Sequence, residues 1–184
     1  MEPLNATAAV KDGQCEIRVG CQNPLGFRQA VANALGFDIE NVTLHNCFMG
    51  GGFGRKSRAD FAIQAALLAA KVARPVQLIW SREEEVRQDF YRPAVQSRFR
   101  AALDANGNLT AWENTYVDKH EPVEAPLIPY AVTARDIGHV SSPTHIPFGA
   151  WRSVAHSQHC FFTESFIDEV AAAAGQDPYE YRAA

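Results

Sequence analysis

The chain has 184 residues, of which 47% are hydrophobic, and its 17 Lys and Arg residues against 21 Asp and Glu residues give a formal net charge of −4. This composition is typical of a globular protein and excludes a disordered, collagen-like or repeat protein, and the absence of a basic run argues against a nucleic-acid partner. The longest uncharged apolar stretch, residues 61–70, is about half of the ~20 residues that span a bilayer, and no signal segment precedes it, so a bacterial cytoplasmic or periplasmic location is left open.

Predicted strands and helices alternate in the first part of the chain. Residues 15–21 alternate apolar and polar side chains and predict a half-buried strand. Residues 27–35 carry apolar side chains at every fourth position, which predicts a helix that ends at Gly36. A second strand is expected over 42–48, and the Ala- and Leu-rich segment 58–73 predicts a helix.

A strand, a capped helix and a hairpin are expected next. Residues 76–80 indicate a buried strand, and Ser81 followed by three glutamates is typical of a capped helix start. Segments 97–103 and 109–117 flank an Asn-Gly pair at 106–107, which adopts positive φ at little cost and so favours a β-hairpin.

The last part of the chain is predicted to be poor in regular structure until its final helix. Residues 120–149 contain five prolines and indicate a long ordered loop with short strands, a feature that is often functional. Residues 156–174 have apolar side chains on one face and predict a helix with Gly175 as its C-cap. Together the elements predict an α+β fold with a mixed sheet and packed helices.

The most distinctive local feature is a glycine-rich loop, Met49 to Ser57, between a predicted strand and a predicted helix. Such a loop exposes backbone N–H groups and allows close approach of an anionic ligand, although an ordinary flexible turn is the alternative. Arg55 stands where the phosphate loop of nucleotide hydrolases has its second glycine, and it also occupies the third glycine position of the dinucleotide fingerprint. The sequence therefore disfavours both nucleotide sites.

Five segments in order resemble one enzyme family. The glycine loop reads Met-Gly-Gly-Gly-Phe-Gly-Arg-Lys over 49–56, and Arg-Pro-Val-Gln-Leu-Ile-Trp-Ser-Arg-Glu-Glu follows at 74–84. Met-Glu-Pro opens the segment 1–8, Gln-Asn-Pro ends the segment 20–24, and Ala-Trp-Arg-Ser-Val-Ala-His-Ser-Gln occupies 150–158. These segments resemble the molybdopterin-binding large subunit of molybdenum hydroxylases, the xanthine dehydrogenase and aldehyde oxidase family, and are most similar to its isoquinoline 1-oxidoreductase branch.

The resemblance implies roles for individual residues. Gln22 would hydrogen-bond an oxo ligand of molybdenum, the glycine loop would bring backbone amides to the pterin and the metal's ligands, and the segment after Trp151 would line the metal from the opposite side. No residue is expected to ligate the metal directly, because a dithiolene holds it and the protein supplies outer donors. The cofactor-binding residues implied are Gln22, Gly51, Gly52, Phe53, Gly54, Arg152, Ser153, Val154, Ala155 and Gln158.

The resemblance also implies an activity, a cofactor and partners. The whole enzyme would hydroxylate an aldehyde or an N-heterocycle with oxygen from water, using a molybdopterin cofactor in its cytosine dinucleotide form. Electrons would leave through a small subunit with iron–sulfur clusters, because four scattered cysteines cannot ligate such clusters. Ser57 replaces the glutamate of purine-converting members, which argues against purine substrates.

The chain is expected to be a fragment that needs the remainder of the large subunit. The family's catalytic glutamate belongs to a downstream Gly-x-x-Glu block that does not follow Arg152 here, so no catalytic residue is expected and the chain alone is expected to be inactive and to self-associate. We expect residues 1–184 to be a partial molybdopterin-binding domain, with a first α/β portion over 1–119 and a loop-rich portion over 120–184.

Two other interpretations of these motifs are possible. A non-catalytic anion-binding, nucleotide-binding or assembly domain would use the same glycine loop without chemistry. His156, His159 and Cys160 could suggest a zinc site, but no further ligand lies nearby in the sequence. The four cysteines lack Cys-x-x-Cys spacing and are expected to be reduced and structural.

Overall fold

The computed structural model describes residues 2–118 and 126–183, and their contacts divide the chain into two compact units. The N-terminal unit comprises residues 1–92 together with 148–152, and the C-terminal unit comprises 93–147 together with 153–184. The expected boundary at residue 119 falls in a segment outside the described residues. No helix of the described chain is long and apolar enough to cross a membrane.

The N-terminal unit contains a four-stranded mixed sheet. Its strands stand in the order β3-β2-β1-β4, with β1 antiparallel to both neighbours and β2 parallel to β3. The strands are β1 (Asn5–Lys11), β2 (Gln14–Val19), β3 (Val42–Asn46) and β4 (Val76–Ile79).

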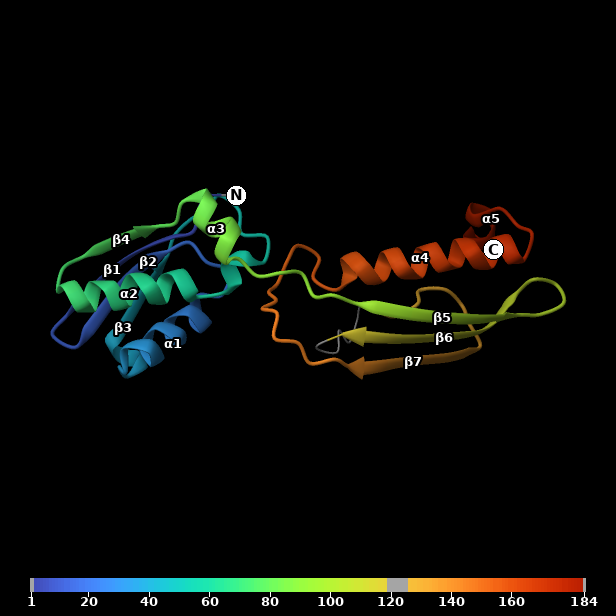
Figure 1. The fold of residues 1–184 in the computed structure, drawn as a ribbon, viewed down its shortest axis with the longest axis horizontal. Helices are drawn as coiled ribbons and strands as arrows, with labels where there is room; N and C mark the ends of the chain where they lie inside the picture. The colour runs from blue at the N-terminus through green and yellow to red at the C-terminus, as the bar shows by residue number, and fades with distance from the viewer. Residues whose placement is uncertain (1, 119–125, 184) are drawn as a thin grey trace. The chain divides into compact units, whose positions relative to one another are not determined.

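Three α-helices belong to this unit, and two of them cover one face of the sheet (Figure 1). They are α1 (Pro24–Leu35), α2 (Asp60–Val72) and α3 (Arg82–Gln88), with short 3-10 turns at Ile39–Asn41 and Arg55–Ser57. Helix α2 packs along β1 because both present alanines: Ala6 and Ala8 of the strand are buried, as are Ala65 and Ala69 of the helix. Small side chains on both elements allow the two backbones to lie close together.

Two helix ends of this unit, at Gly36 and Ser81, follow the capping predicted from the sequence, and Asn23 adds a third cap. The Asn23 side chain accepts a hydrogen bond from the Gly26 amide at 3.0 Å, and Gly36 ends α1 with φ of +69°. The Ser81 hydroxyl accepts from the Glu84 amide at 3.2 Å, which confirms the capped helix predicted at that position.

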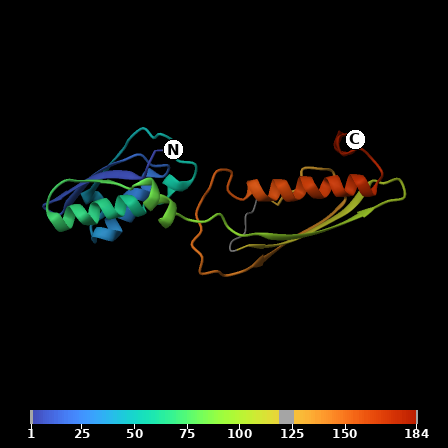
Figure 2. The same ribbon diagram turned by 45° about the horizontal axis from the view of Figure 1, so that its top comes forward.

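The C-terminal unit is a three-stranded mixed sheet with helix α4 along one face (Figure 2). Strands β5 and β6 form the predicted hairpin, and Gly107 in its turn has φ of +84° while the Asp104 carboxylate accepts from the amides of Asn106 and Asn108. The elements are β5 (Gln96–Leu103), β6 (Leu109–Asp118), β7 (Ala134–Ser141), α4 (His156–Ala173) and α5 (Pro178–Ala183).

Aromatic side chains form the core beneath α4. Phe99 of β5 and Trp112 of β6 meet edge to face at 5.3 Å between ring centroids, and Phe166 of α4 lies 5.0 Å from the first and 5.1 Å from the second. Ile167 of the same helix is buried against them. This cluster holds α4 on the sheet through dispersion and ring-edge contacts.

The α+β class with mixed sheets is confirmed, and the differences from the predicted elements have physical reasons. Strand β1 was not predicted, because its buried face consists of alanines whose alternation with polar residues gives a weak apolar signal. The helix predicted from residue 58 begins at Asp60, because Arg55–Ser57 form a 3-10 turn and Arg58 is extended. Part of the expected loop 120–149 is the eight-residue strand β7, which pairs in parallel with β6.

Candidate cofactor-binding site

The glycine loop follows β3 and is tied to the chain's first residues. The Gly50 amide donates to the Glu2 carboxylate at 3.0 Å, and the other carboxylate oxygen forms an ion pair with the Lys56 ammonium. Lys56 is fully buried, while the Glu2 side chain is 31% exposed. The hydrogen bond from Lys56 is the main cause of a Glu2 pKa below its ordinary value. The Met-Glu-Pro segment and the loop therefore form one ion-paired assembly.

Gln22 fixes the opposite end of the loop. Its side-chain oxygen accepts a hydrogen bond from the backbone amide of Gly54 at 2.9 Å. The backbone amide of Gln22 donates to the Lys56 carbonyl at 2.9 Å. A Cβ at Gly52 would lie 2.5 Å from the Gln22 side-chain oxygen, so a larger residue at position 52 would displace the Gln22 side chain. Because the oxygen is engaged within the protein, the side-chain NH₂ group of Gln22 is the part that remains to donate to a ligand.

Three consecutive backbone amides of the loop form no hydrogen bond with any described residue. The neighbouring amides of Gly50, Gly54 and Arg55 all have acceptors, whereas those of Gly51, Gly52 and Phe53 have none. Unpaired N–H groups at a partly buried loop are costly unless water or a ligand accepts from them. The loop thus presents a row of donors suited to an anionic or oxygen-rich group.

Phe53 has a strained backbone at the tip of this row. Its φ is +49°, in the left-handed region that side chains disfavour, and its ring is 52% exposed. Gly51 and Gly54, on either side, both have φ of +93°. Strain of this kind persists where surrounding contacts impose it, and it is common at ligand clamps.

The Arg55 side chain connects the glycine loop to two other segments of the N-terminal unit. Its buried guanidinium pairs with Asp60 at 2.7 Å and with Asp89 at 2.6 Å, and it lies 5.8 Å from the Trp80 ring and 5.2 Å from the Phe90 ring. One side chain therefore joins the loop to the start of α2 and to the segment after α3. In the sequence, Arg55 was notable only because it departs from the glycine motifs. The one local sign of its ion pairs is Asp60, five positions later.

The segment 148–152 forms the facing wall of the site within the N-terminal unit. The Gly149 amide donates to the Tyr91 carbonyl at 3.1 Å, and the Trp151 indole N–H donates to the Phe90 carbonyl at 3.0 Å. A Cβ at Gly54 would lie 2.4 Å from the Ala150 carbonyl oxygen, which shows how closely the loop and the wall approach.

Six of the ten predicted residues therefore belong to one compact unit. Gln22 contacts Gly54 directly, and the Arg152 guanidinium lies 6.0 Å from the centre of the Phe53 ring. Gly51 and Gly52 complete the loop between them.

The other four predicted residues belong to the C-terminal unit. Ser153 and Val154 have φ of +67° and +45°, which is a costly conformation for a β-branched side chain, and they form the turn into α4. Ala155 is buried, and its carbonyl accepts from the Gln158 amide at 3.2 Å. The predicted cofactor roles of these four residues stay predictions.

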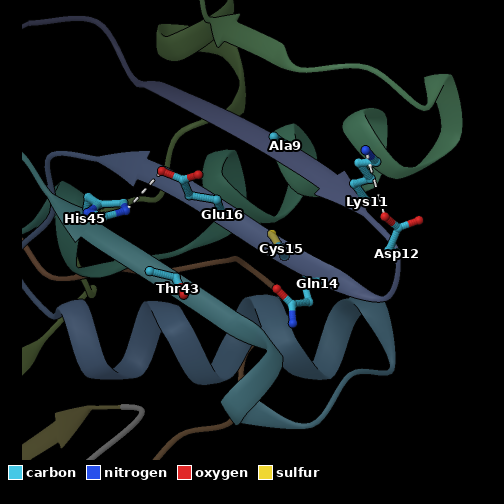
Figure 3. Close-up of a pocket in the computed structure, with 8 residues that line it drawn as sticks. All are labelled: Ala9, Lys11, Asp12, Gln14, Cys15, Glu16, Thr43 and His45. Carbon is cyan, nitrogen blue, oxygen red and sulfur yellow. Dashed lines mark ion pairs between the residues drawn. The ribbon is translucent and has the colours of Figure 1, made fainter.

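A hollow with a volume of about 680 Å³ lies on the open face of the N-terminal sheet, away from its helices (Figure 3). Glu16 of β2 points toward His45 of β3 at 3.1 Å and also pairs with Arg18 at 2.6 Å, while Lys11 pairs with Asp12. The charges of this surface are thus paired with one another, and among the described residues no group of three or more His, Cys, Asp or Glu side chains could hold a metal ion.

The three residues considered for a zinc site differ in burial, with one buried and two exposed. His159 is completely buried beneath the Tyr116 ring at 5.0 Å between centroids, whereas His156 and Cys160 are exposed on α4. Burial lowers the pKa of His159, with a smaller opposing effect from the charge of Asp118. This histidine is therefore part of the core of the C-terminal unit.

Comparison with known proteins identifies the family of this chain. The sequence profile of the molybdopterin cofactor-binding domain matches residues 1–184. The chain belongs to the molybdopterin cofactor-binding domain family. The resemblance seen in the glycine loop, Gln22 and the segment around Arg152 is thereby confirmed at the level of the family.

Curated relatives of this domain are oxidoreductase subunits. The chain is 26% identical to the isoquinoline 1-oxidoreductase subunit beta of Brevundimonas diminuta, over 100% of the chain and 26% of the relative. It is 32% identical to the aldehyde oxidoreductase molybdenum-binding subunit PaoC of Escherichia coli (strain K12), over 99% of the chain and 26% of the relative. The domain thus spans about a quarter of the length of the curated relatives that it matches.

Solved structures confirm the fold of the domain. Quinoline 2-oxidoreductase from Pseudomonas putida 86 superposes with a TM-score of 0.85 at 24% identity, covering 99% of this chain and 26% of that one. The aldehyde oxidoreductase from Desulfovibrio gigas gives a TM-score of 0.83 at 25% identity, covering 98% of this chain and 21% of that one. The fold class predicted from the sequence, the α+β molybdopterin-binding type, is therefore correct.

Proposed function

We propose that this domain holds the molybdopterin cofactor of an oxidoreductase that hydroxylates an aldehyde or an N-heterocycle with oxygen from water. The observation that carries the proposal is the row of three amides at Gly51, Gly52 and Phe53, which have no acceptor among the described residues. This row of amides lies beside Gln22, whose side-chain oxygen already accepts a hydrogen bond from the Gly54 amide. A cofactor rich in phosphate, thiolate and oxo groups supplies the acceptors that these donors lack.

The domain's residues fit such a cofactor in their chemistry. Gln22 would donate its side-chain NH₂ group, the loop would donate its amides, and Arg152 would line the cofactor opposite the loop. On the family resemblance alone, we also propose that Ser153, Val154, Ala155 and Gln158 contact the cofactor. When bound, the molybdenum cofactor would supply the two-electron redox chemistry, and the residues named here would bind and orient it.

No residue of this chain is proposed as the catalytic base. The carboxylates near the loop are engaged elsewhere, since Glu2 pairs with Lys56, and Asp60 and Asp89 pair with Arg55. We therefore propose that the base comes from another part of the large subunit, and that the chain alone does not turn over substrate.

We propose two protein partners for the domain, the remainder of a molybdenum large subunit and a small subunit with iron–sulfur clusters. Exposed apolar side chains on α2, at Leu67, Leu68 and Val72, are suited to packing against other protein or against a second copy of the chain. The cytosine dinucleotide form of the cofactor belongs to the same proposal, and its nucleotide can be identified after acid hydrolysis.

The direct test is metal and pterin analysis of the complete large subunit, purified from cells that synthesise molybdopterin. We expect molybdenum and a fluorescent oxidised pterin in stoichiometric amounts in the wild-type protein. The variant Gly52→Val should lose both, because its side chain would displace the Gln22 side chain, whose oxygen accepts from the Gly54 amide and whose NH₂ group would contact the cofactor.

A matched control separates this effect from general damage. Gly138 lies in β7 with ordinary φ and with nothing within 4 Å of an added Cβ, so Gly138→Val should retain the metal and the pterin. Active wild-type protein without molybdenum would refute the proposed function. Retention of the cofactor by Gly52→Val would refute the role of the loop.

A further inference from the structure

The cavity between the glycine loop and the segment 148–152 has a volume of about 320 Å³, which is at the lower end of the ~300–1,000 Å³ range of small-molecule sites. All of the residues that line it belong to the N-terminal unit. The loop supplies Gly52 and Phe53, and the facing wall runs from Gly149 to Arg152.

The walls of the cavity are held by specific contacts. The Trp151 indole is fixed by its hydrogen bond to the Phe90 carbonyl, and a Cβ at Gly149 would lie 2.7 Å from the Phe90 Cβ, so backbone and ring are closely packed there. Phe53 is held in a left-handed conformation on the opposite side. A cavity with walls fixed in this way is pre-organised for a ligand.

Aromatic rings dominate the lining of the cavity and are only partly covered by protein. Phe53 is 52% exposed, Trp151 is 43% exposed and Phe90 is half-buried. Large aromatic rings left exposed around one cavity gain contact area when a planar ring enters between them. The shape and chemistry of the lining therefore favour a flat aromatic ligand.

The charge of the lining is positive. Arg55 is neutralised by Asp60 and Asp89, but Arg58 and Arg152 have no acidic partner anywhere in the described part of the chain. Arg58 lies 4.1 Å from the centre of the Phe90 ring, and Arg152 lies 6.0 Å from that of Phe53. Each cation thus rests against a ring of the cavity, with its N–H groups left for an anion.

We propose that this cavity binds an aromatic carboxylate, with its ring against Phe53, Phe90 and Trp151 and its carboxylate between Arg58 and Arg152. That this ligand is also the substrate, which would then be an N-heterocyclic carboxylate, rests on the proposed function. The binding of the ligand rests only on the cavity. Planar guanidinium groups pair well with the two oxygens of a carboxylate, which gives the site a preference over neutral analogues of the same shape.

Isothermal titration of the purified chain with 2-naphthoate and with neutral 2-naphthamide tests the proposal, since the two probes share one ring and differ in charge. We expect 2-naphthoate to bind at least about tenfold more tightly, as one charge-assisted contact supplies. Arg58→Gln and Arg152→Gln should each abolish most of this preference, and Arg58→Lys should retain part of it because the charge remains. Arg18→Gln, on the open sheet face, is the matched control and should bind like the wild type.

Three outcomes would overturn the proposal. Equal affinity for the two naphthalene probes would remove the role of the arginines. A preference that survives in both glutamine variants would place the site elsewhere. Inorganic phosphate that displaces 2-naphthoate at equal concentration would show a site for anions without a ring requirement.

The same titrations distinguish this proposal from the proposed function. Tight 2-naphthoate binding in a protein that never contains molybdenum would leave the ligand site intact and refute the cofactor role. Molybdenum-loaded protein that shows no preference for 2-naphthoate would support the cofactor role and refute the ligand site.

Discussion

The Glu2–Lys56 ion pair predicts unequal costs for removing its two partners. Lys56 is fully buried, whereas Glu2 is 31% exposed and also accepts from the Gly50 amide. Glu2→Leu would leave an unpaired ammonium in the protein interior, while Lys56→Met would leave a carboxylate that still reaches water. The variant that removes the more exposed residue should therefore be the more damaging one.

The loss of folding free energy in each variant depends on the environment of the charged group that is left without its partner. Breaking a buried pair by removing one partner costs about 3–5 kcal/mol, so Glu2→Leu, which leaves the fully buried Lys56 ammonium unpaired, should cost about 3–5 kcal/mol. Lys56→Met should cost about 1–2 kcal/mol, because solvent and the Gly50 amide stabilise the remaining carboxylate. The double variant should be more stable than Glu2→Leu alone, because no buried charge is left unpaired.

Hydrogen exchange of the amides in β2 under native conditions measures these costs, because it reports the opening of the N-terminal unit separately from the C-terminal one. The pH dependence gives a second check. The pKa of Glu2 lies below its ordinary value of 4.5, so the pair's contribution should be present above about pH 4.5 and lost as the pH falls through the lower folded value. A Lys56→Met variant as unstable as Glu2→Leu would refute the reasoning.

Three other predictions concern separate parts of the chain. Gly54→Ala should cost at least about 2 kcal/mol more than Gly36→Ala in thermal or urea unfolding, because both positions have positive φ but only the first meets a carbonyl oxygen, at 2.4 Å; equal costs would contradict the close approach. The C-terminal unit should lose stability as the pH falls below about 6.5, because burial lowers the pKa of His159 and protonation must then accompany unfolding; hydrogen exchange in α4 measures this loss, which His159→Leu should abolish. Burial raises the pKa of the Cys15 thiol to about 11, so a thiol reagent at pH 8 should label exposed Cys47 and leave Cys15 unmodified until the chain unfolds; rapid labelling of both would refute its burial.

Local patterns predicted most of the helices and the hairpin because their signals are contained in neighbouring residues. The caps at Gly36 and Ser81 each depend on a hydrogen bond within a few positions, and the turn at Gly107 requires only a residue that tolerates positive φ. Strand β1 escaped prediction because its position in the sheet depends on pairing with β2 and β4, and its buried alanines become informative only once α2 packs on them.

The family resemblance selected Gln22 and the loop glycines, but it did not indicate the ion pairs that support the loop. The structure places Gln22 against Gly54, and the cofactor roles of these residues stay predictions. The ion pairs of Arg55 with Asp89 and of Lys56 with Glu2 join residues 34 and 54 positions apart, and no local pattern indicates such partners. Buried charges of this kind can be found only when the fold has brought the distant segments together.

The short wall at 148–152 has a consequence for how the domain is made. It belongs to the N-terminal unit, yet it follows residues 93–147, which belong to the C-terminal unit. During synthesis, the sheet and helices of the first 92 residues can assemble while one wall of their cavity is still missing. The cavity is therefore completed late on the ribosome, and a nascent chain stopped before residue 148 should protect β1 and β2 from proteases while leaving the glycine loop open to cleavage.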